Sequence, residues 1–172
     1  MNDTTTLKNG KPKLKLSLSN LEWVLLVISI FSMIFIWVYL LLNYGKLPQR
    51  VPTHTDFSGK INSWGDKGIL FLLPILQTFL FFLLTIISRF PHKFNYTVKI
   101  TDENAERQYR NSRTLMGWIT LTISVVFSYI GWNTIQMAKN NSMRFGIWFI
   151  PVFLVVMFGI IGIYIYKMIK LK

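Results

Sequence analysis

The stretch LPQRVPTHTDFSGKINSWGDK, residues 47–67, separates two long apolar blocks and decides how the rest of the chain is laid out. It is the densest run of prolines, glycines, charges and hydrogen-bonding side chains in the sequence. The flanking blocks, residues 21–42 and 68–88, are long enough to cross a hydrocarbon core of about 30 Å at roughly 1.5 Å per helical residue. We therefore expect a polar loop, residues 43–67, between two membrane-spanning helices, and we look for function in that loop first.

Two further apolar blocks, residues 115–138 and 145–169, predict a third and a fourth span. The sequence thus predicts an all-α fold, an integral membrane four-helix bundle with a structured extracellular loop. A single membrane domain, residues 21–172, would follow a mobile basic tail at 1–20. Acidic residues from Asp102 to Glu106 fit the first turns of a helix, so we expect a cytoplasmic helical extension of the third span. Residues 89–101 alternate apolar and polar side chains, which indicates either a strand or an amphipathic interfacial segment.

Composition narrows the class of protein. Hydrophobic residues make up 52% of the 172 residues, and the formal net charge is +12. Basic loops facing anionic lipid explain this charge, so the lipid bilayer is an expected partner and a nucleic acid is not. The chain has no cysteine, which excludes disulfides and thiolate metal sites. We expect no cofactor and no metal.

The distribution of positive charge predicts the orientation. Of the 19 Lys and Arg residues, 13 lie in the tail, in residues 89–114 or at the C-terminus, and 6 lie in residues 43–67 and 139–145. Because positive loops stay in the cytoplasm, both termini and residues 89–114 should be cytoplasmic, with the loop 43–67 outside.

Polar residues within the spans concentrate in the predicted outer half. Pro74 and Pro151 should bend their helices, and Gln77, Asn133 and Gln136 lie at a similar depth or just above it. These groups either line a polar pocket that opens outward or hold the helices together by hydrogen bonds.

Two further patterns concern the interior of the spans. Small residues at helical spacing, from Gly117 to Gly131, predict a packing face. Glu22 lies at the end of its span, where it can reach water, and no ionisable residue lies deeper, which disfavours an ion-coupled transporter.

The loop itself offers several chemical interpretations. His54 and Asp56, with Asp66, could form a metal site, although a simple hydrogen-bonded loop explains them as well. No serine or cysteine stands in a nucleophile context, so we expect no catalytic residues and no enzyme. The remaining interpretation is a ligand-binding surface. Its candidate residues are Arg50, His54, Asp56, Gly59, Asn62, Trp64, Asp66 and Lys67.

The loop residues also carry a family resemblance. They resemble the signature of a bacterial membrane family of unknown function, whose domain also forms the N-terminal part of SdpI-type bacteriocin-immunity proteins. The resemblance covers roughly residues 25–115 and includes Asn104–Tyr109, which is similar to the family's cytoplasmic segment. The signature residues are Leu47, Pro48, Val51, Pro52, Thr53, His54, Asp56, Gly59, Asn62, Trp64, Gly65 and Lys67.

This resemblance implies a multi-pass protein of the bacterial plasma membrane. It implies immunity, in which the outer loop recognises a membrane-active peptide, a toxin or a lipid and a cytoplasmic regulator receives a signal. The candidate surface for that regulator comprises Asn104, Arg107, Gln108 and Arg110. The full immunity proteins carry further helices, whereas four are predicted here. The alternative is a membrane enzyme or small-solute permease that uses the outer polar pocket.

Overall fold

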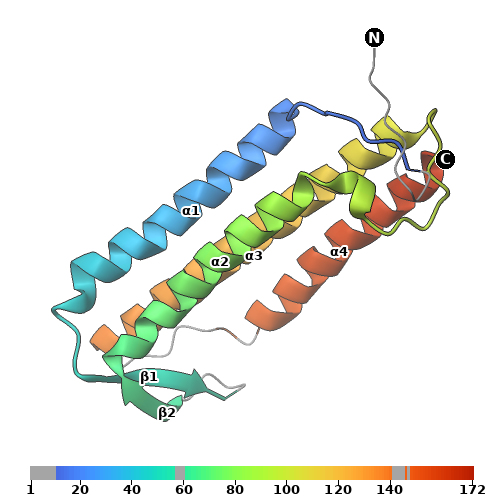
Figure 1. Ribbon diagram of the computed structural model, residues 1–172. Coiled ribbons are helices and arrows are strands. Elements are labelled where there is room, and N and C mark those ends of the chain that lie inside the picture. Colours follow the sequence, from blue (N-terminus) through green and yellow to red (C-terminus); the bar gives the residue numbers. More distant parts are fainter. Residues whose placement is uncertain (1–10, 57–60, 141–145, 147) are drawn as a thin grey trace.

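The computed structural model describes residues 11–56, 61–140, 146 and 148–172. In these residues, four helices are long and apolar enough to cross a membrane, and a two-stranded antiparallel sheet joins the first helix to the second (Figure 1). In chain order, the elements are α1 (Asn20–Tyr44), β1 (Arg50–Thr55), β2 (Ile61–Asp66), the 3-10 helix η1 (Lys67–Phe71), α2 (Leu72–Ser88), the 3-10 helix η2 (Pro91–Lys93), α3 (Ala105–Asn140) and α4 (Phe149–Lys170). The fold is mostly helical, and the hairpin adds a small sheet to the predicted all-α fold.

Helix α1 begins with a reciprocal cap. The backbone N–H of Glu22 donates to Ser19 Oγ (3.2 Å), and the backbone N–H of Ser19 donates to Glu22 Oε2 (2.7 Å). Two N–H groups that have no partner within the helix are thereby satisfied, which fixes the start of α1. The Glu22 side chain therefore folds back toward the backbone of Ser19.

Pro74 and Pro151 occupy the first turns of α2 and α4, at the third helical residue of each. At this position the missing N–H removes no bond from the helix interior. The sequence placed both prolines inside longer spans and predicted bends there. In the structure the regular helices begin later, at Leu72 and Phe149, so the prolines precede the helix interiors.

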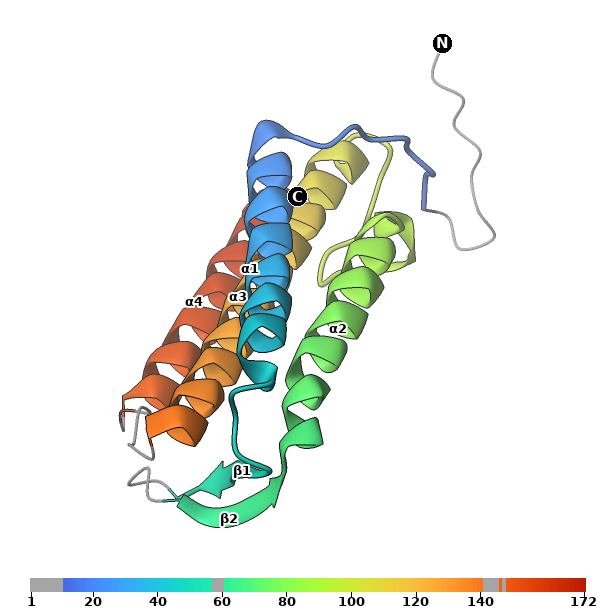
Figure 2. The same ribbon diagram turned by 90° about the vertical axis from the view of Figure 1, so that its left-hand side faces the viewer.

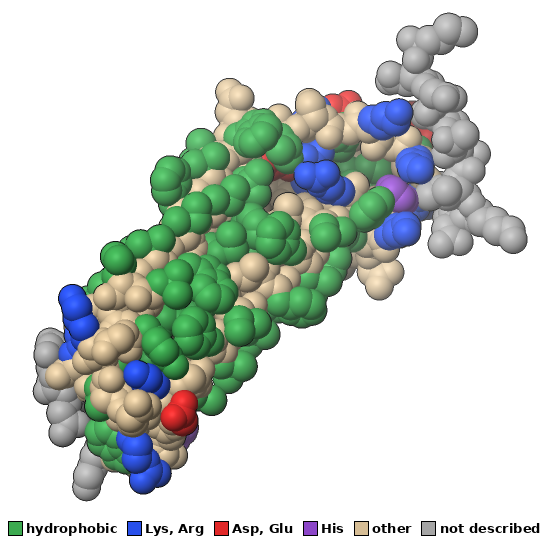
Figure 3. Space-filling view, turned by 60° about the vertical axis from the view of Figure 1, so that its left-hand side comes forward, with side chains coloured by type: hydrophobic (Ala, Val, Ile, Leu, Met, Phe, Trp, Pro, Cys, Tyr) green, Lys and Arg blue, Asp and Glu red, His purple; other side chains and the backbone are tan. Residues whose placement is uncertain are grey.

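Helix α3 is central and packs against α1, α2 and α4 (Figures 1 and 2). The small residues of α3 allow a close approach to α1. A Cβ atom on Gly117 would lie 3.1 Å from Leu25 Cδ1, and one on Gly131 would lie 2.8 Å from Ile36 Cδ1. The predicted packing face is therefore confirmed. On the face seen in Figure 3, hydrophobic side chains cover the middle and basic side chains lie toward the two ends.

The end that carries the hairpin contains the main hydrophobic core. Val51 of β1 and Leu47 before it are buried against residues from three helical elements. Their buried neighbours are Ile36 and Leu40 of α1, Leu70 of η1 and Ile135 of α3. The segment between α1 and α2 is thus packed onto the helix ends.

The opposite end, which we call the terminal end, carries residues 11–19, residues 89–104 and the last turn of α4 (Figure 1). Tyr109 Oη donates to the carbonyl of Pro12 (2.9 Å), and Lys11 Nζ donates to the carbonyl of Phe94 (2.6 Å). The expected mobile tail is therefore corrected for residues 11–19, which are bonded to the rest of the chain. Residues 1–10 lie outside the described residues.

Residues 94–100 form no strand, although their alternation predicted one as one of two possibilities. The alternation instead appears as alternating burial. Phe94, Tyr96, Val98 and Ile100 face inward, while the residues between them are exposed. Ile100 packs with Ala105 and Tyr109, so this segment is held by side-chain burial without a sheet partner.

Candidate functional site

The hairpin brings several predicted site residues together. His54 pairs with Ser63 across the two strands, and His54 Nδ1 lies 2.6 Å from Asn62 Oδ1. Because an amide oxygen only accepts, the ring nitrogen Nδ1 is the donor in this contact. Thr53 Oγ1 donates to Ser63 Oγ (3.0 Å) on the same sheet. The exposed side chains therefore form short polar contacts from strand to strand.

Close backbone packing and capping contacts hold the base of the hairpin. A Cβ atom on Gly65 would lie 2.7 Å from Thr53 Cγ2, so only glycine fits beside Thr53 without a shift. Asp66 Oδ1 accepts from the N–H of Gly68 (2.7 Å) and caps η1. The ammonium of Lys67 lies 4.7 Å from the centre of the Tyr44 ring, which is a cation–π distance.

The other predicted loop residues are placed as follows. Arg50, Asp56 and Trp64 are exposed, and the Trp64 side chain is 44% exposed. Asp66 lies opposite Arg50 at the base of the hairpin, several residues along from His54, so the three candidate metal ligands are not gathered. The described residues hold no group of three His, Cys, Asp or Glu side chains that could bind a metal ion. Gly59 lies outside the described residues.

Of the predicted outer-pocket residues, Gln77 bonds to another helix and Asn133 bonds within α3. Gln77 Nε2 donates to Ser128 Oγ (3.1 Å), and Ser128 Oγ donates to the carbonyl of Ser32 (2.7 Å). Asn133 is fully buried and donates to the carbonyl of Tyr129 (3.1 Å), while Gln136 is half-buried. The Gln77 contacts link α1, α2 and α3. This agrees with the second of the two interpretations of the sequence, in which these polar groups hold the helices together.

The predicted cytoplasmic partner surface is divided between buried and exposed residues. Asn104 Nδ2 donates to the carbonyl of Lys99 (3.0 Å), and Gln108 Nε2 donates to the carbonyls of Met168 (2.8 Å) and Leu171 (3.0 Å). Both side chains are buried and serve the fold. Arg107 is exposed, and Arg110 is partly exposed in an ion pair with Glu106 (2.9 Å), so only these two positions remain at the surface.

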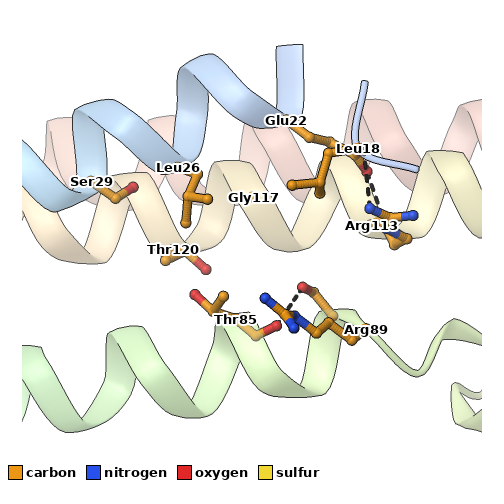
Figure 4. Close-up of a pocket in the computed structure, with 10 residues that line it drawn as sticks. Leu18, Glu22, Leu26, Ser29, Thr85, Arg89, Arg113, Gly117 and Thr120 are labelled. Carbon is orange, nitrogen blue, oxygen red and sulfur yellow. Dashed lines mark hydrogen bonds and ion pairs between the residues drawn. The ribbon is translucent and has the colours of Figure 1, made fainter. Parts of the chain in front are cut away.

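A cavity of about 60 Å³ lies at the terminal end, where the sequence predicted no site (Figure 4). Glu22 and Arg113, which are 6% and 8% exposed, form an ion pair beside it. The cavity is lined by Leu18, Glu22, Leu26, Ser29, Thr85, Ser88, Arg89, Arg113, Gly117 and Thr120. Sequence reasoning missed it because a carboxylate at the end of a span is expected to reach water.

The two oxygens of Glu22 differ in their contacts. Glu22 Oε2 accepts from the Ser19 backbone and lies 3.4 Å from Arg113 Nη2. Glu22 Oε1 lies 3.4 Å from Arg113 Nε, but it accepts no hydrogen bond from any described residue. Arg113 also donates to the carbonyl of Leu16 (2.9 Å), which ties the tail to α3. One buried carboxylate oxygen thus remains without a donor.

Burial shifts the pKa of two groups at the terminal end that lie outside the four long helices. Desolvation lowers the pKa of His92 from its usual 6.5, and the charges of Lys13 and Lys93 lower it further. Burial raises the pKa of Tyr96 to about 12. Both groups are therefore held in their neutral forms near neutral pH, which suits the crowded positive charge at this end.

The four apolar helices indicate a multi-pass membrane protein. Residues 31–78, from the middle of α1 through the hairpin to the start of α2, match the model of a family described as a domain of unknown function, DUF1648. This match agrees with the resemblance to a family of unknown function that the loop signature indicated.

One relative extends the comparison. An uncharacterized protein from Archaeoglobus fulgidus is 30% identical over 98 residues, which cover 51% of this chain and 52% of the relative. The chain therefore spans about half the length of the curated relative that it matches. No solved structure matches the chain.

Proposed function

We propose that this protein resides in the plasma membrane and that its hairpin recognises a membrane-active peptide at the outer surface, in the manner of the SdpI-type immunity proteins. The hairpin carries the proposal. One side is fixed in the core by the fully buried Val51, and the other side presents Trp64, His54 and Asn62 to solvent. Recognition requires side chains that are held in place, and this anchoring supplies that rigidity.

Charge supports the orientation. The tail, residues 89–114 and the end of α4 together contain 13 of the 19 Lys and Arg residues, and the described parts of these segments begin or lie at the terminal end. The positive-inside rule then assigns this end to the cytoplasm and the hairpin to the outside. Arg107 and Arg110 would be accessible to a cytoplasmic regulator in this orientation.

The geometry of the sheet suggests how a peptide would bind. β1 lies against α3, and β2 forms the outer strand of the hairpin (Figure 2). β1 contains Pro52, which lacks an N–H donor, whereas β2 contains no proline. An extended peptide could therefore pair with the edge of β2, and the exposed Trp64 would supply the apolar contact that dominates many interfaces.

Survival of cells that express the full chain tests this function. A panel of synthetic membrane-active peptides is applied to a sensitive bacterial host, and the inhibitory concentration is measured with and without the protein. We expect protection against at least one peptide. Trp64→Ala should weaken binding by about 2 kcal/mol, or roughly thirtyfold, and abolish most of the protection.

Trp23→Ala is the matched control, because it removes an exposed tryptophan of α1 at the terminal end. This variant should protect as well as the wild type when membrane levels are equal. Protection by Trp64→Ala equal to that of Trp23→Ala, or protection against none of the peptides, would contradict the proposal.

A further inference from the structure

The cavity at the terminal end has a wall that a ligand can reach from outside. It opens between α1 and α2, which diverge toward this end (Figure 2). Leu18 and Leu26 line its α1 side, and Thr85, Ser88 and Arg89 line its α2 side (Figure 4). All five residues are exposed or half-buried. The accessible wall therefore places two aliphatic side chains opposite two hydroxyl groups and a guanidinium.

The cavity carries one excess positive charge. Glu22 and Arg113 neutralise each other in their buried ion pair (3.4 Å). The guanidinium of Arg89, in contrast, is exposed and forms no ion pair or hydrogen bond with any residue that the structure describes. A ligand with one negative charge would therefore complement the charge of the cavity.

The hydroxyl groups beside Arg89 differ in the hydrogen bonds that they can still make. Ser88 Oγ donates to the carbonyl of Thr85 (2.8 Å), so it keeps only its lone pairs for a ligand. The hydroxyl of Thr85 points into the cavity and has no partner in the described part of the chain (Figure 4). Thr85 and Arg89 thus offer one O–H donor and a planar set of N–H donors, which suit the oxygens of a phosphate.

The depth of the cavity points to a lipid as the source of this phosphate. Arg89 directly follows the apolar helical segment Lys67–Ser88. It therefore lies at the level where the hydrocarbon core ends and the lipid headgroups begin. Leu26 lies farther along the apolar helix α1, toward the hydrocarbon. A phospholipid combines a phosphate and an acyl chain in the same order.

We propose that this cavity binds the phosphate of an anionic phospholipid such as phosphatidylglycerol. The guanidinium of Arg89 and the hydroxyl of Thr85 would donate to the phosphate oxygens, and an acyl chain would lie along Leu26 between α1 and α2. A volume of about 60 Å³ has room for a phosphate group but not for a whole lipid, since a water molecule takes roughly 30 Å³ in the liquid. The site is independent of the hairpin and of the peptide recognition proposed above.

Lipids that differ in their headgroups test the role of charge. The purified full chain in detergent is titrated with dioctanoyl forms of phosphatidylglycerol and phosphatidylcholine, and binding is followed by native mass spectrometry. Phosphatidylcholine carries the same phosphate, but its choline cation cancels the negative charge. We expect phosphatidylglycerol to bind about fivefold more tightly. Dioctanoylglycerol, which lacks the phosphate, should bind more weakly than either phospholipid.

Variants with matched controls test the two donors. Arg89→Gln should weaken phosphatidylglycerol binding by about tenfold. Lys99→Gln removes one exposed positive charge at the same end, outside the cavity, and should leave binding unchanged. Thr85→Val should weaken binding by about fivefold. Thr122→Val makes the same substitution on α3, outside this cavity, and should have no effect.

Several results would overturn the proposal. Equal binding of the two phospholipids would refute the preference for an anionic lipid. Equal affinities of Arg89→Gln and Lys99→Gln would show attraction by the overall positive charge, without a site at the cavity. Dioctanoylglycerol bound as tightly as phosphatidylglycerol would exclude a phosphate contact. Displacement of the lipid by inorganic phosphate at equal concentration would make the ligand a free anion in place of a lipid.

Discussion

Gly131 of α3 faces the side chain of Ile36 across the contact with α1. A Cβ atom on Gly131 would lie 2.8 Å from Ile36 Cδ1 and 3.0 Å from Ile36 Cγ1, and Ile36 is fully buried. The isoleucine therefore has little room to move away. The contact between α1 and α3 therefore depends on the absence of a side chain at Gly131. Small residues commonly let membrane helices approach closely in this way.

Gly131→Ala should consequently destabilise the protein by about 1–3 kcal/mol through overpacking. Gly162 provides the matched control, because a Cβ atom there would meet nothing within 4 Å. Gly162→Ala should be neutral or slightly stabilising, since alanine favours the helix. Thermal unfolding in detergent measures both variants. A stability of Gly131→Ala equal to that of Gly162→Ala would show that α3 and α1 are not in close contact here.

His92 predicts how stability depends on pH. Its pKa lies below 6.5 in the folded protein because of burial and the charges of Lys13 and Lys93, whereas in the unfolded chain it titrates near 6.5. As the pH falls below 6.5, the unfolded chain binds a proton that the folded protein resists, so stability decreases. Between pH 7.5 and 5.5, the melting temperature of the wild type should fall more than that of His92→Gln. Parallel curves for the two proteins would contradict this assignment.

Glu22 illustrates a property of single residues that the sequence does not predict, namely burial by a partner far along the chain. Its position at the end of an apolar block led to the expectation that it reaches water, whereas Glu22 is only 6% exposed. Its burial depends on Arg113, which lies 91 residues along the chain. No local pattern reveals such a partner, and the same applies to Gln108, which reads as a surface residue but donates to the carbonyl of Met168.

The membrane-spanning helices were easier to predict from the sequence than the hairpin and its tertiary contacts. The expected spans 21–42 and 68–88 differ by only a few residues from the apolar helical segments Asn20–Tyr44 and Lys67–Ser88, because length and hydropathy determine both. The hairpin was not predicted. Its strands contain Pro52, Gly65 and several polar residues, so the sequence lacks the alternation of apolar and polar residues that predicts a strand. The packing of Val51 against the ends of the helices is a tertiary contact that no local sequence pattern predicts.

Val51 should be the main anchor of the hairpin. Val51→Ala removes buried methyl groups and should cost about 2 kcal/mol, since the side chain is fully buried against the helix ends. If the hairpin opens locally, cleavage by trypsin at Arg50 and Lys67 should be roughly thirtyfold faster. Gln49→Ala, at an exposed neighbouring position, should leave the cleavage rate unchanged. Equal cleavage of the two variants would mean that Val51 does not hold the hairpin.

At the scale of the whole molecule, orientation is the property that can be tested most directly. The chain has no cysteine, so one introduced cysteine is a unique label. Gln49 is exposed beside the hairpin, and Thr101 is exposed at the terminal end. In intact cells an impermeant maleimide should label Gln49→Cys, and Thr101→Cys should react only after permeabilisation. Labelling of both in intact cells, or the reverse pattern, would contradict the proposed orientation.

The central position of α3 also bears on how the protein is made. α1 and α2 emerge from the ribosome first, yet their polar groups find their partners on α3. Until Arg113 and Ser128 have been synthesised, Glu22 has no ion-pair partner and Gln77 lacks its hydrogen bond. The hydrocarbon core of the bilayer offers no substitute for the partner of Gln77. We therefore expect nascent chains that end before residue 113 to stay bound to the insertion machinery, and release into the bilayer to follow the arrival of the third helix.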